Sequence, residues 1–382
     1  MIYLDNAATT YPKPARVVGM LQNSARFYGA NPGRGGYEMC MNTSARVYEV
    51  RKRLAQFFNA ERAENVVFTS NCTHALNIAV NGFAKSGSHV LTSCLEHNSV
   101  MRPLEKMRRE GKIVYNCAQI GKTDDETVDN FRALISRRTC MIVCTCASNV
   151  FGDILPIRRI GQLAKERNIP LVVDAAQAAG ILKIDMSKDN ISCLCLPGHK
   201  GLYGPMGTGA VILSGDHIPD TLICGGTGTA SKQLEQPWDL PERFESGTLN
   251  VPGILSLGEG VDFVSKVGMK KMRYHENDLM SYLYSSLKEI DGIHLYNEYD
   301  KNRRVPVLSF NVGDMPCEQV SEYLGQDGIA VRGGFHCNPS AHKYYETYDI
   351  GTLRVSVSYF NSKKDIDILL NSIKKIAKRQ IM

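Results

Sequence analysis

An acid and a lysine stand where a mostly parallel α/β sheet would bring them together. The run Val172-Val173-Asp174 has the apolar, β-branched pattern of a buried strand that ends in a carboxylate, and Lys200 follows in the small-residue turn Gly198-His199-Lys200-Gly201. Open α/β sheets bind their ligands at the carboxyl ends of the strands. Pyridoxal phosphate needs a lysine for its Schiff base and a carboxylate against its pyridinium nitrogen, so this pair indicates that chemistry. Taken alone, Asp174 would more often be a helix cap and Lys200 a surface residue.

Other ligand-binding motifs do not match. Gly121-Lys122-Thr123 has the form of the end of a P-loop, but Asn116 stands where that loop requires glycine. The sequence contains neither a Gly-x-Gly-x-x-Gly after a strand nor a His-Glu-x-x-His pair. These absences argue against an ATPase, a Rossmann dinucleotide enzyme and a zinc protease.

The composition is that of a globular protein. The 382 residues are 43% hydrophobic and 22% charged, which excludes a disordered chain and a small stapled scaffold. No run approaches the ~18 consecutive apolar residues of a membrane span, and the N-terminus lacks a basic region followed by an apolar one. We therefore expect a cytoplasmic protein without a membrane partner. The net charge of +6 is spread along the chain, so we expect no nucleic-acid partner either.

The twelve cysteines predict free thiols in a reducing compartment. No Cys-x-x-Cys pair recurs at zinc spacing, so we expect no metal site. Cys140, Cys144 and Cys146 share even parity with Ile142, which predicts that these thiols lie together on one buried face of a strand.

From residue 66 to residue 213, short apolar runs alternate with amphipathic stretches of helical period. The apolar runs span 66–69, 89–92, 112–115, 141–145 and 170–174, and the helical patterns span 73–83, 126–135 and 157–167. This alternation predicts βαβ units, and so an α/β fold with a mostly parallel central sheet flanked by helices.

The segment 225–252 is rich in Gly, Thr and Pro and has no clear period, which is typical of a functional loop or linker. Beyond it the sequence predicts a long helical pattern over 254–290, apolar runs at 307–310, 329–331 and 353–357, and helices near 317–324 and 363–379. We predict a large cofactor-binding α/β domain over 15–253. A small α+β domain, made of 1–14 and 254–382, would carry Arg332, Cys337 and Arg354.

Four motifs, in order along nearly the whole chain, resemble those of the class V aminotransferase family. They are the segments 4–10 (Leu-Asp-Asn-Ala-Ala-Thr-Thr), 173–177, 198–205 and 332–337 (Arg-Gly-Gly-Phe-His-Cys). The resemblance is strongest to the branch of cysteine desulfurases and selenocysteine lyases with an Arg-x-x-x-His-Cys segment. It implies the aspartate aminotransferase-like fold type I of pyridoxal-phosphate enzymes.

The resemblance also implies roles around the cofactor ring. Lys200 would form the Schiff base, Asp174 would pair with the pyridinium nitrogen and Gln177 would reach the ring oxygen. His97 would stack on the ring and move protons.

The cofactor phosphate would lie at the start of the helix over 73–83. The resemblance assigns this end of the cofactor to Thr73, with Cys72 beside it, and to His199, and a helix N-terminus is a ready anion site. Pro197 stands where relatives carry Ser or Thr. Thr248 matches a threonine that relatives supply from the neighbouring subunit, which implies a homodimer with shared active sites.

The resemblance assigns the substrate carboxylate to Arg354, with Arg332 lining the same mouth and Asn149 near substrate and cofactor. Cys337 would be the nucleophile, with a pKa lowered by His336 and the two arginines. The implied reaction converts L-cysteine to L-alanine: Lys200 removes the α-proton, and Cys337 takes the sulfur as a persulfide.

Several alternatives stay open. Selenocysteine lyase, with L-selenocysteine as substrate, or another class V aminotransferase or lyase would use the same fold. A sulfur-acceptor protein is expected, but the sequence does not separate iron–sulfur cluster assembly, tRNA thiolation and selenium metabolism.

Overall fold

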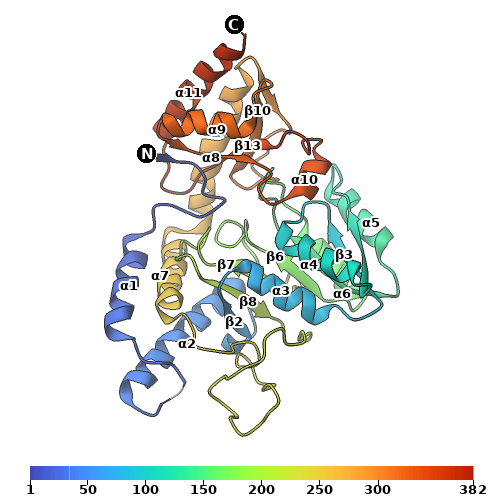
Figure 1. Cartoon of the computed structure of the whole chain (residues 1–382), viewed down its shortest axis with the longest axis vertical. Helices are drawn as coiled ribbons and strands as arrows, with labels where there is room; N and C mark the ends of the chain where they lie inside the picture. Colours follow the sequence, from blue (N-terminus) through green and yellow to red (C-terminus); the bar gives the residue numbers. More distant parts are fainter. Residues whose placement is uncertain (34, 382) are drawn as a thin grey trace.

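The computed structural model describes residues 1–33 and 35–381; residues 34 and 382, which fall inside the predicted domain ranges, lie outside the described residues. A seven-stranded sheet forms the centre of the larger part of the molecule (Figure 1). In spatial order its strands are β2 (Val66–Thr69), β8 (Gly209–Leu213), β7 (Cys193–Pro197), β6 (Leu171–Asp174), β5 (Thr139–Thr145), β3 (Ser88–Ser93) and β4 (Ile113–Ala118). Only β8 runs against the others. The predicted mostly parallel sheet is confirmed.

Helices bury both faces of this sheet, which is why its strands are apolar throughout rather than alternating. One face packs on α3 (Cys72–Phe83) and α4 (Asn98–Arg109). The other packs on α2 (Glu38–Phe58), α5 (Asp124–Leu134), α6 (Ile157–Glu166) and α7 (Val251–Val267). Neighbouring residues of one strand divide between the faces: Val172 faces α3, and Val173 belongs to the core on the opposite side. α1 (Ala15–Phe27) lies outside, against α7.

The expectation for the strand cysteines is only partly right. Cys144 and Cys146 lie in the same core as Ile142, but Cys140 packs on the opposite face. The cause is a β-bulge, because His89 of β3 pairs with Thr139 and Val90 pairs with Met141, which leaves Cys140 as the extra residue. A bulge shifts the alternation of side chains by one position. All twelve cysteines are free thiols.

A second, antiparallel sheet forms the smaller part of the molecule, at the top of Figure 1. Its order is β12 (Arg332–Gly334), β13 (Thr352–Ser356), β10 (Val307–Val312) and β9 (Ile293–Leu295). It packs with α8 (Met269–Lys288), α9 (Cys317–Gln326) and α11 (Lys363–Ile381) around one apolar core. The short helix α10 (Pro339–Tyr344) follows the loop that contains Cys337.

The helical pattern over 254–290 proves to be two helices, and not one. α7 ends at Val267 and α8 begins at Met269, with Gly268 at a φ of 90° between them. This left-handed conformation suits glycine and ends a helix. Ile254, Leu257 and Val261 of α7 belong to the core of the large sheet. The domain division at 253/254 stays a prediction.

The N-terminal segment lies across both parts of the molecule. β1 (Ile2–Tyr3) pairs in parallel with β11 (Ile329–Ala330), and Asp5 forms a bridge with Ser356 at the end of β13. Residues 6–13 then run to the part of the molecule that contains the seven-stranded sheet, where the Thr10 amide donates to the carbonyl of His199. Among the described residues, no helix is both long and apolar enough to cross a membrane.

Gly260 allows α7 to approach the turn that follows Lys200. A Cβ atom at position 260 would lie 2.2 Å from the carbonyl oxygen of Leu202, which is backbone and cannot turn aside. We expect Gly260→Ala to lower the free energy of unfolding in urea by about 1–3 kcal/mol. Gly19→Ala in α1 is the matched control, because no atom lies within 4 Å of its added Cβ. The control should leave stability unchanged or raise it by about 1 kcal/mol. Equal effects from the two substitutions would contradict the close approach.

Candidate active site

A cavity opens at the carboxyl ends of β5, β6 and β7, against the start of α3. It brings together eight of the residues that the sequence singled out: Cys72, Thr73, His97, Asn149, Asp174, Gln177, His199 and Lys200. Pro197, Ser99 and Thr145 also line it. Strand ends converge here because the strands are parallel, as expected for a ligand site in an open α/β sheet.

Burial shifts the pKa values of Asp174 and Lys200 in opposite directions. Asp174 is buried, and its Oδ1 accepts hydrogen bonds from the amide of Ala176 at 2.8 Å and from Cys72 Sγ at 3.5 Å. Burial raises the pKa of Asp174, and the Ala176 bond and the charge of Lys200 oppose that rise. Burial lowers the pKa of Lys200, with Asp174 opposing. Burial therefore favours the neutral amine, which is the nucleophilic form of lysine.

His97 is held in one neutral tautomer. It precedes α4 as the N-cap, and its Nδ1 accepts the backbone N–H of Ser99 at 3.1 Å, with Ser99 Oγ at 2.9 Å. Because Nδ1 is the acceptor, the ring proton sits on Nε2. Burial, with further contributions from Lys200 and nearby arginines, lowers the pKa of His97 to about 4.

The start of α3 and His199 form a polar end of the cavity. The first amides of a helix stand outside its hydrogen-bond ladder, and here they belong to Cys72 and Thr73. Thr73 Oγ1 lies 2.7 Å from Ser99 Oγ. His199 Nδ1 is buried and has no hydrogen-bond partner within the described part of the chain. Burial, then Lys200 and Lys13, lowers the pKa of His199 to about 4, so its ring is neutral near pH 7.

The N-terminal segment holds the turn that carries Lys200. The carbonyl oxygen of His199 accepts hydrogen bonds from Thr9 Oγ1 at 3.1 Å, the Thr10 amide at 3.1 Å and Lys13 Nζ at 2.8 Å. Gln177 Nε2 donates to the carbonyl of Ala7 at 3.0 Å. Thr9 and Thr10 belong to the motif 4–10, but no local pattern marks their contact with His199, or that of Lys13, because the partners are so distant in sequence.

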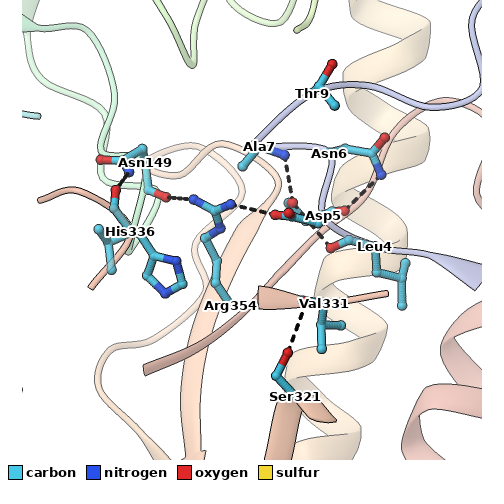
Figure 2. Close-up of polar contacts among 12 residues, drawn as sticks. Leu4, Asp5, Asn6, Ala7, Thr9, Asn149, Ser321, Val331, His336 and Arg354 are labelled. Atoms are coloured by element: carbon cyan, nitrogen blue, oxygen red, sulfur yellow. Dashed lines mark hydrogen bonds and ion pairs between the residues drawn. The ribbon is translucent and has the colours of Figure 1, made fainter. Parts of the chain in front are cut away.

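Arg354 is buried rather than at the strand surface. Its side chain is 2% exposed, and its Nη2 pairs with Asp5 Oδ1 at 2.6 Å. Its Nη1 donates to the carbonyl oxygen of Asn149 at 2.9 Å. Figure 2 shows the guanidinium between these two groups. Asp5 was missed as a functional residue, since nothing near it in the sequence suggests a partner in β13.

Arg354 and the remaining predicted residues lie outside the cavity lining. Cys337 is exposed, and Arg332 is exposed on β12, paired in register with Arg354. His336 is buried; its Nε2 donates to the carbonyl of Thr352 at 3.0 Å, and its ring stacks on His342. Burial lowers the pKa of His336 well below its usual value, so the ring does not supply the positive charge that we expected beside the thiol. Thr248 is exposed on the loop before α7.

A mostly parallel seven-stranded sheet with one reversed strand, an acid at the end of β6 and a lysine after β7 define fold type I of the pyridoxal-phosphate enzymes. The class V aminotransferase family matches residues 2–369. A probable cysteine desulfurase from Methanothermobacter thermautotrophicus is 32% identical across 98% of this chain and 94% of that protein. Another from Synechocystis is 29% identical across 98% of this chain and 90% of that protein.

Solved structures agree. The apo structure of cysteine desulfurase from Thermococcus onnurineus has a TM-score of 0.91 at 26% identity, over 99% of this chain and 95% of that chain. The chain belongs to the class V aminotransferase family, as its motifs predicted. Members of this family are pyridoxal-phosphate enzymes.

The tautomer of His97 can be tested directly. Because its pKa lies near 4, the ring should stay neutral with the proton on Nε2 from about pH 5.5 to pH 8.5 and gain a proton only as the pH falls toward 4. Nitrogen chemical shifts from a pH titration by NMR would show this, with His97→Asn used to assign the signals. A midpoint near pH 6.5, or a proton on Nδ1, would contradict the buried N-cap geometry.

Proposed function

We propose that the protein is a pyridoxal-phosphate-dependent cysteine desulfurase, which converts L-cysteine to L-alanine and holds the sulfur as a persulfide on Cys337. The observation that carries this proposal is the arrangement of a partly buried lysine and a buried acid in one cavity, with Asn149 of its lining bound to both Arg354 and the Cys337 loop. The names of the similar proteins support the same reaction.

The residues present fit the cofactor. The buried, unpartnered Nδ1 of His199 and the amides at the start of α3 are what a phosphate group requires. Lys200 would carry the cofactor. Asp174 would face the ring nitrogen, and burial raises the pKa of this carboxyl. The proposed cofactor-binding residues also include Gln177, His97, Asn149, Cys72, Thr73 and Thr248. When bound, pyridoxal phosphate supplies an electron sink that acidifies the α-hydrogen of an amino acid.

Protons would move through groups that burial keeps neutral. Lys200, favoured as the neutral amine, can accept a proton on Nζ and return it. His97 can donate only from Nε2, because Nδ1 is committed to Ser99. His336 donates from Nε2 to Thr352, which leaves its Nδ1 as an acceptor beside Cys337 in the chain.

Arg354 would bind the substrate carboxylate. Asp5 and Asn149 each accept a hydrogen bond from one terminal nitrogen of Arg354. The Nε of Arg354 has no hydrogen-bond partner within residues 1–33 and 35–381. A guanidinium with donors left over in a buried site binds a carboxylate strongly and in a fixed orientation. Arg332, exposed on the neighbouring strand, would line the entrance.

Cys337 would accept the sulfur. Its Sγ forms a bond to the substrate sulfur while the carbon–sulfur bond breaks, and the β-carbon keeps that electron pair and takes a proton to become the methyl group of L-alanine. Cys337 is exposed, so an acceptor protein with a thiol can reach the persulfide. Selenocysteine lyase is the alternative, because the same thiolate can attack selenium. Twelve free thiols support a reducing, cytoplasmic location.

We also propose a homodimer with shared active sites. Large apolar side chains stay exposed on α1, α2 and the loop before α7, as on an uncovered interface: Phe27, Met39, Met41, Ile223, Leu234 and Trp238. Thr248 lies on that same loop, outside the cavity of its own chain. This loop extends away from the body of the molecule in Figure 1.

The reaction is tested by alanine release from L-cysteine, with a reducing thiol and the cofactor-loaded protein. We expect alanine from the wild type and a loss of about 100-fold or more in Cys337→Ser, since the hydroxyl cannot accept sulfur. Activity on L-selenocysteine but not on L-cysteine would favour the lyase. An unaffected Cys337→Ser variant would exclude persulfide chemistry at this thiol.

Shared sites are tested by mixing two impaired variants, Lys200→Ala and Thr248→Glu. If Thr248 serves the partner's site, a hybrid dimer has one site with both defects and one with neither. Random mixing should then restore about a quarter of wild-type activity, because about half of the dimers are hybrids with one working site. Activity that stays at the mean of the two parents would contradict shared sites.

A further inference from the structure

We propose that Asn338 is a positioning residue for Cys337: its side-chain amide, joined to Asn149, holds the nucleophile loop in a strained shape and ties it to Arg354. This inference rests on the proposed function, which assigns Cys337 as the nucleophile. Asn338 directly follows the motif 332–337 and is not part of it.

The loop has a backbone that must be held in place. His336 has a φ of 50° and Cys337 a φ of 57°, so two consecutive residues with side chains adopt the left-handed conformation. Residues other than glycine rarely do so, and they persist there only where the surroundings fix them. The strain falls on the residue that would carry the sulfur.

Both peptide carbonyls beside Cys337 are bound by residues of the large domain. Asn149 Nδ2 donates to the carbonyl of His336 at 2.8 Å, and the amide of Asn98 donates to the carbonyl of Cys337 at 2.8 Å. Asn98 is the first residue of α4, directly after His97. The orientation of the two peptide units around the nucleophile is therefore set from outside the loop.

Asn338 completes this arrangement from within. It is 0% exposed, and its Nδ2 donates to the carbonyl of Leu95 at 2.8 Å and to Asn149 Oδ1 at 2.9 Å. Both ends of the Asn149 amide are thus occupied. The bond from Asn338 fixes which way that amide faces, and so presents Nδ2 of Asn149 to His336.

The same asparagine connects the loop to the carboxylate-binding arginine. The carbonyl of Asn149 accepts from Arg354, whose other terminal nitrogen is held by Asp5 (Figure 2). A continuous chain of hydrogen bonds therefore runs from Asp5 through Arg354 and Asn149 to the residues on either side of Cys337. It would fix the distance between the substrate carboxylate and the attacking sulfur.

Asn338 also caps a helix, and this role must be separated from the positioning of Cys337. Its Oδ1 accepts the amide of Ala341 at 3.0 Å and so caps α10. Asn338→Ser keeps an oxygen that can cap a helix and removes the amide donor. Thr123→Ala is the matched control: it removes the cap of α5, where Thr123 Oγ1 accepts from Glu126, in a helix outside the site.

The experiment compares two reactions of the cofactor-loaded protein. Alanine release from L-cysteine needs Cys337, whereas exchange of the α-hydrogen of L-alanine with deuterated water uses Lys200 and Arg354 and does not need the Cys337 thiol. We expect Asn338→Ser to lower kcat for alanine release about 10- to 100-fold, as misplacement of a reacting group does. KM for L-cysteine and the exchange rate should stay within about twofold, and Thr123→Ala should match the wild type in both reactions.

Other results would overturn the proposal. Equal losses in exchange and in alanine release would show a general structural role, and wild-type kcat would show that the amide bond is unnecessary. If Asn338→Ser does not fold, Asn338→Asp, which has the same size and lacks the donor, serves in its place.

A further measurement does not depend on desulfuration. In the unloaded protein, we expect iodoacetamide to alkylate Cys337 about threefold faster or more in Asn338→Ser, because a released loop exposes the thiol in more conformations. Mass analysis of the Cys337 peptide gives the rate, with Thr123→Ala as control. A wild type that releases no alanine would refute the proposed function, and the alkylation rates would still decide the role of Asn338.

Discussion

The charge of Arg354 is the constraint on which the active site depends. A guanidinium that is 2% exposed needs a counter-charge, and that charge is Asp5, 349 positions earlier in the chain. The ion pair with Asp5 holds the N-terminal segment between the two parts of the molecule. Once there, the same segment binds the carbonyl of His199 and the side chain of Gln177. The substrate end and the lysine end of the site are therefore held by one stretch of chain.

Burial then determines the chemistry of the cavity. It favours the neutral amine of Lys200, lowers the pKa values of His97 and His199 to about 4, and raises that of Asp174. In this cavity, burial therefore favours the neutral forms of Lys200, His97 and His199. Such a site can move protons without building up charge, and it leaves room for an anionic phosphate. The thiol stands apart from this environment, on an exposed loop.

Local pattern accounts for much of the fold. Apolar strands that alternate with amphipathic helices, and the strand that ends at Asp174, could be read from the sequence because both faces of a parallel sheet are buried. The bulge at Cys140 could not, since it depends on how neighbouring strands pair, whereas the break at Gly268 was missed although glycine is a local signal for a helix end. Lys200, Asp174 and Cys337 were found through motifs. Asp5, Lys13 and Asn338 were missed because their roles come from partners far away in sequence.

The separation between Asp5 and Arg354 also bears on the order in which the chain is made. Asp5 is synthesised 349 positions before Arg354, so the pair can form only after β13 has been made. A growing chain that already contains Lys200 and Cys337 still lacks the group that would hold a substrate carboxylate. The ion pair that would orient a substrate carboxylate therefore forms only after Lys200 and Cys337 have been synthesised.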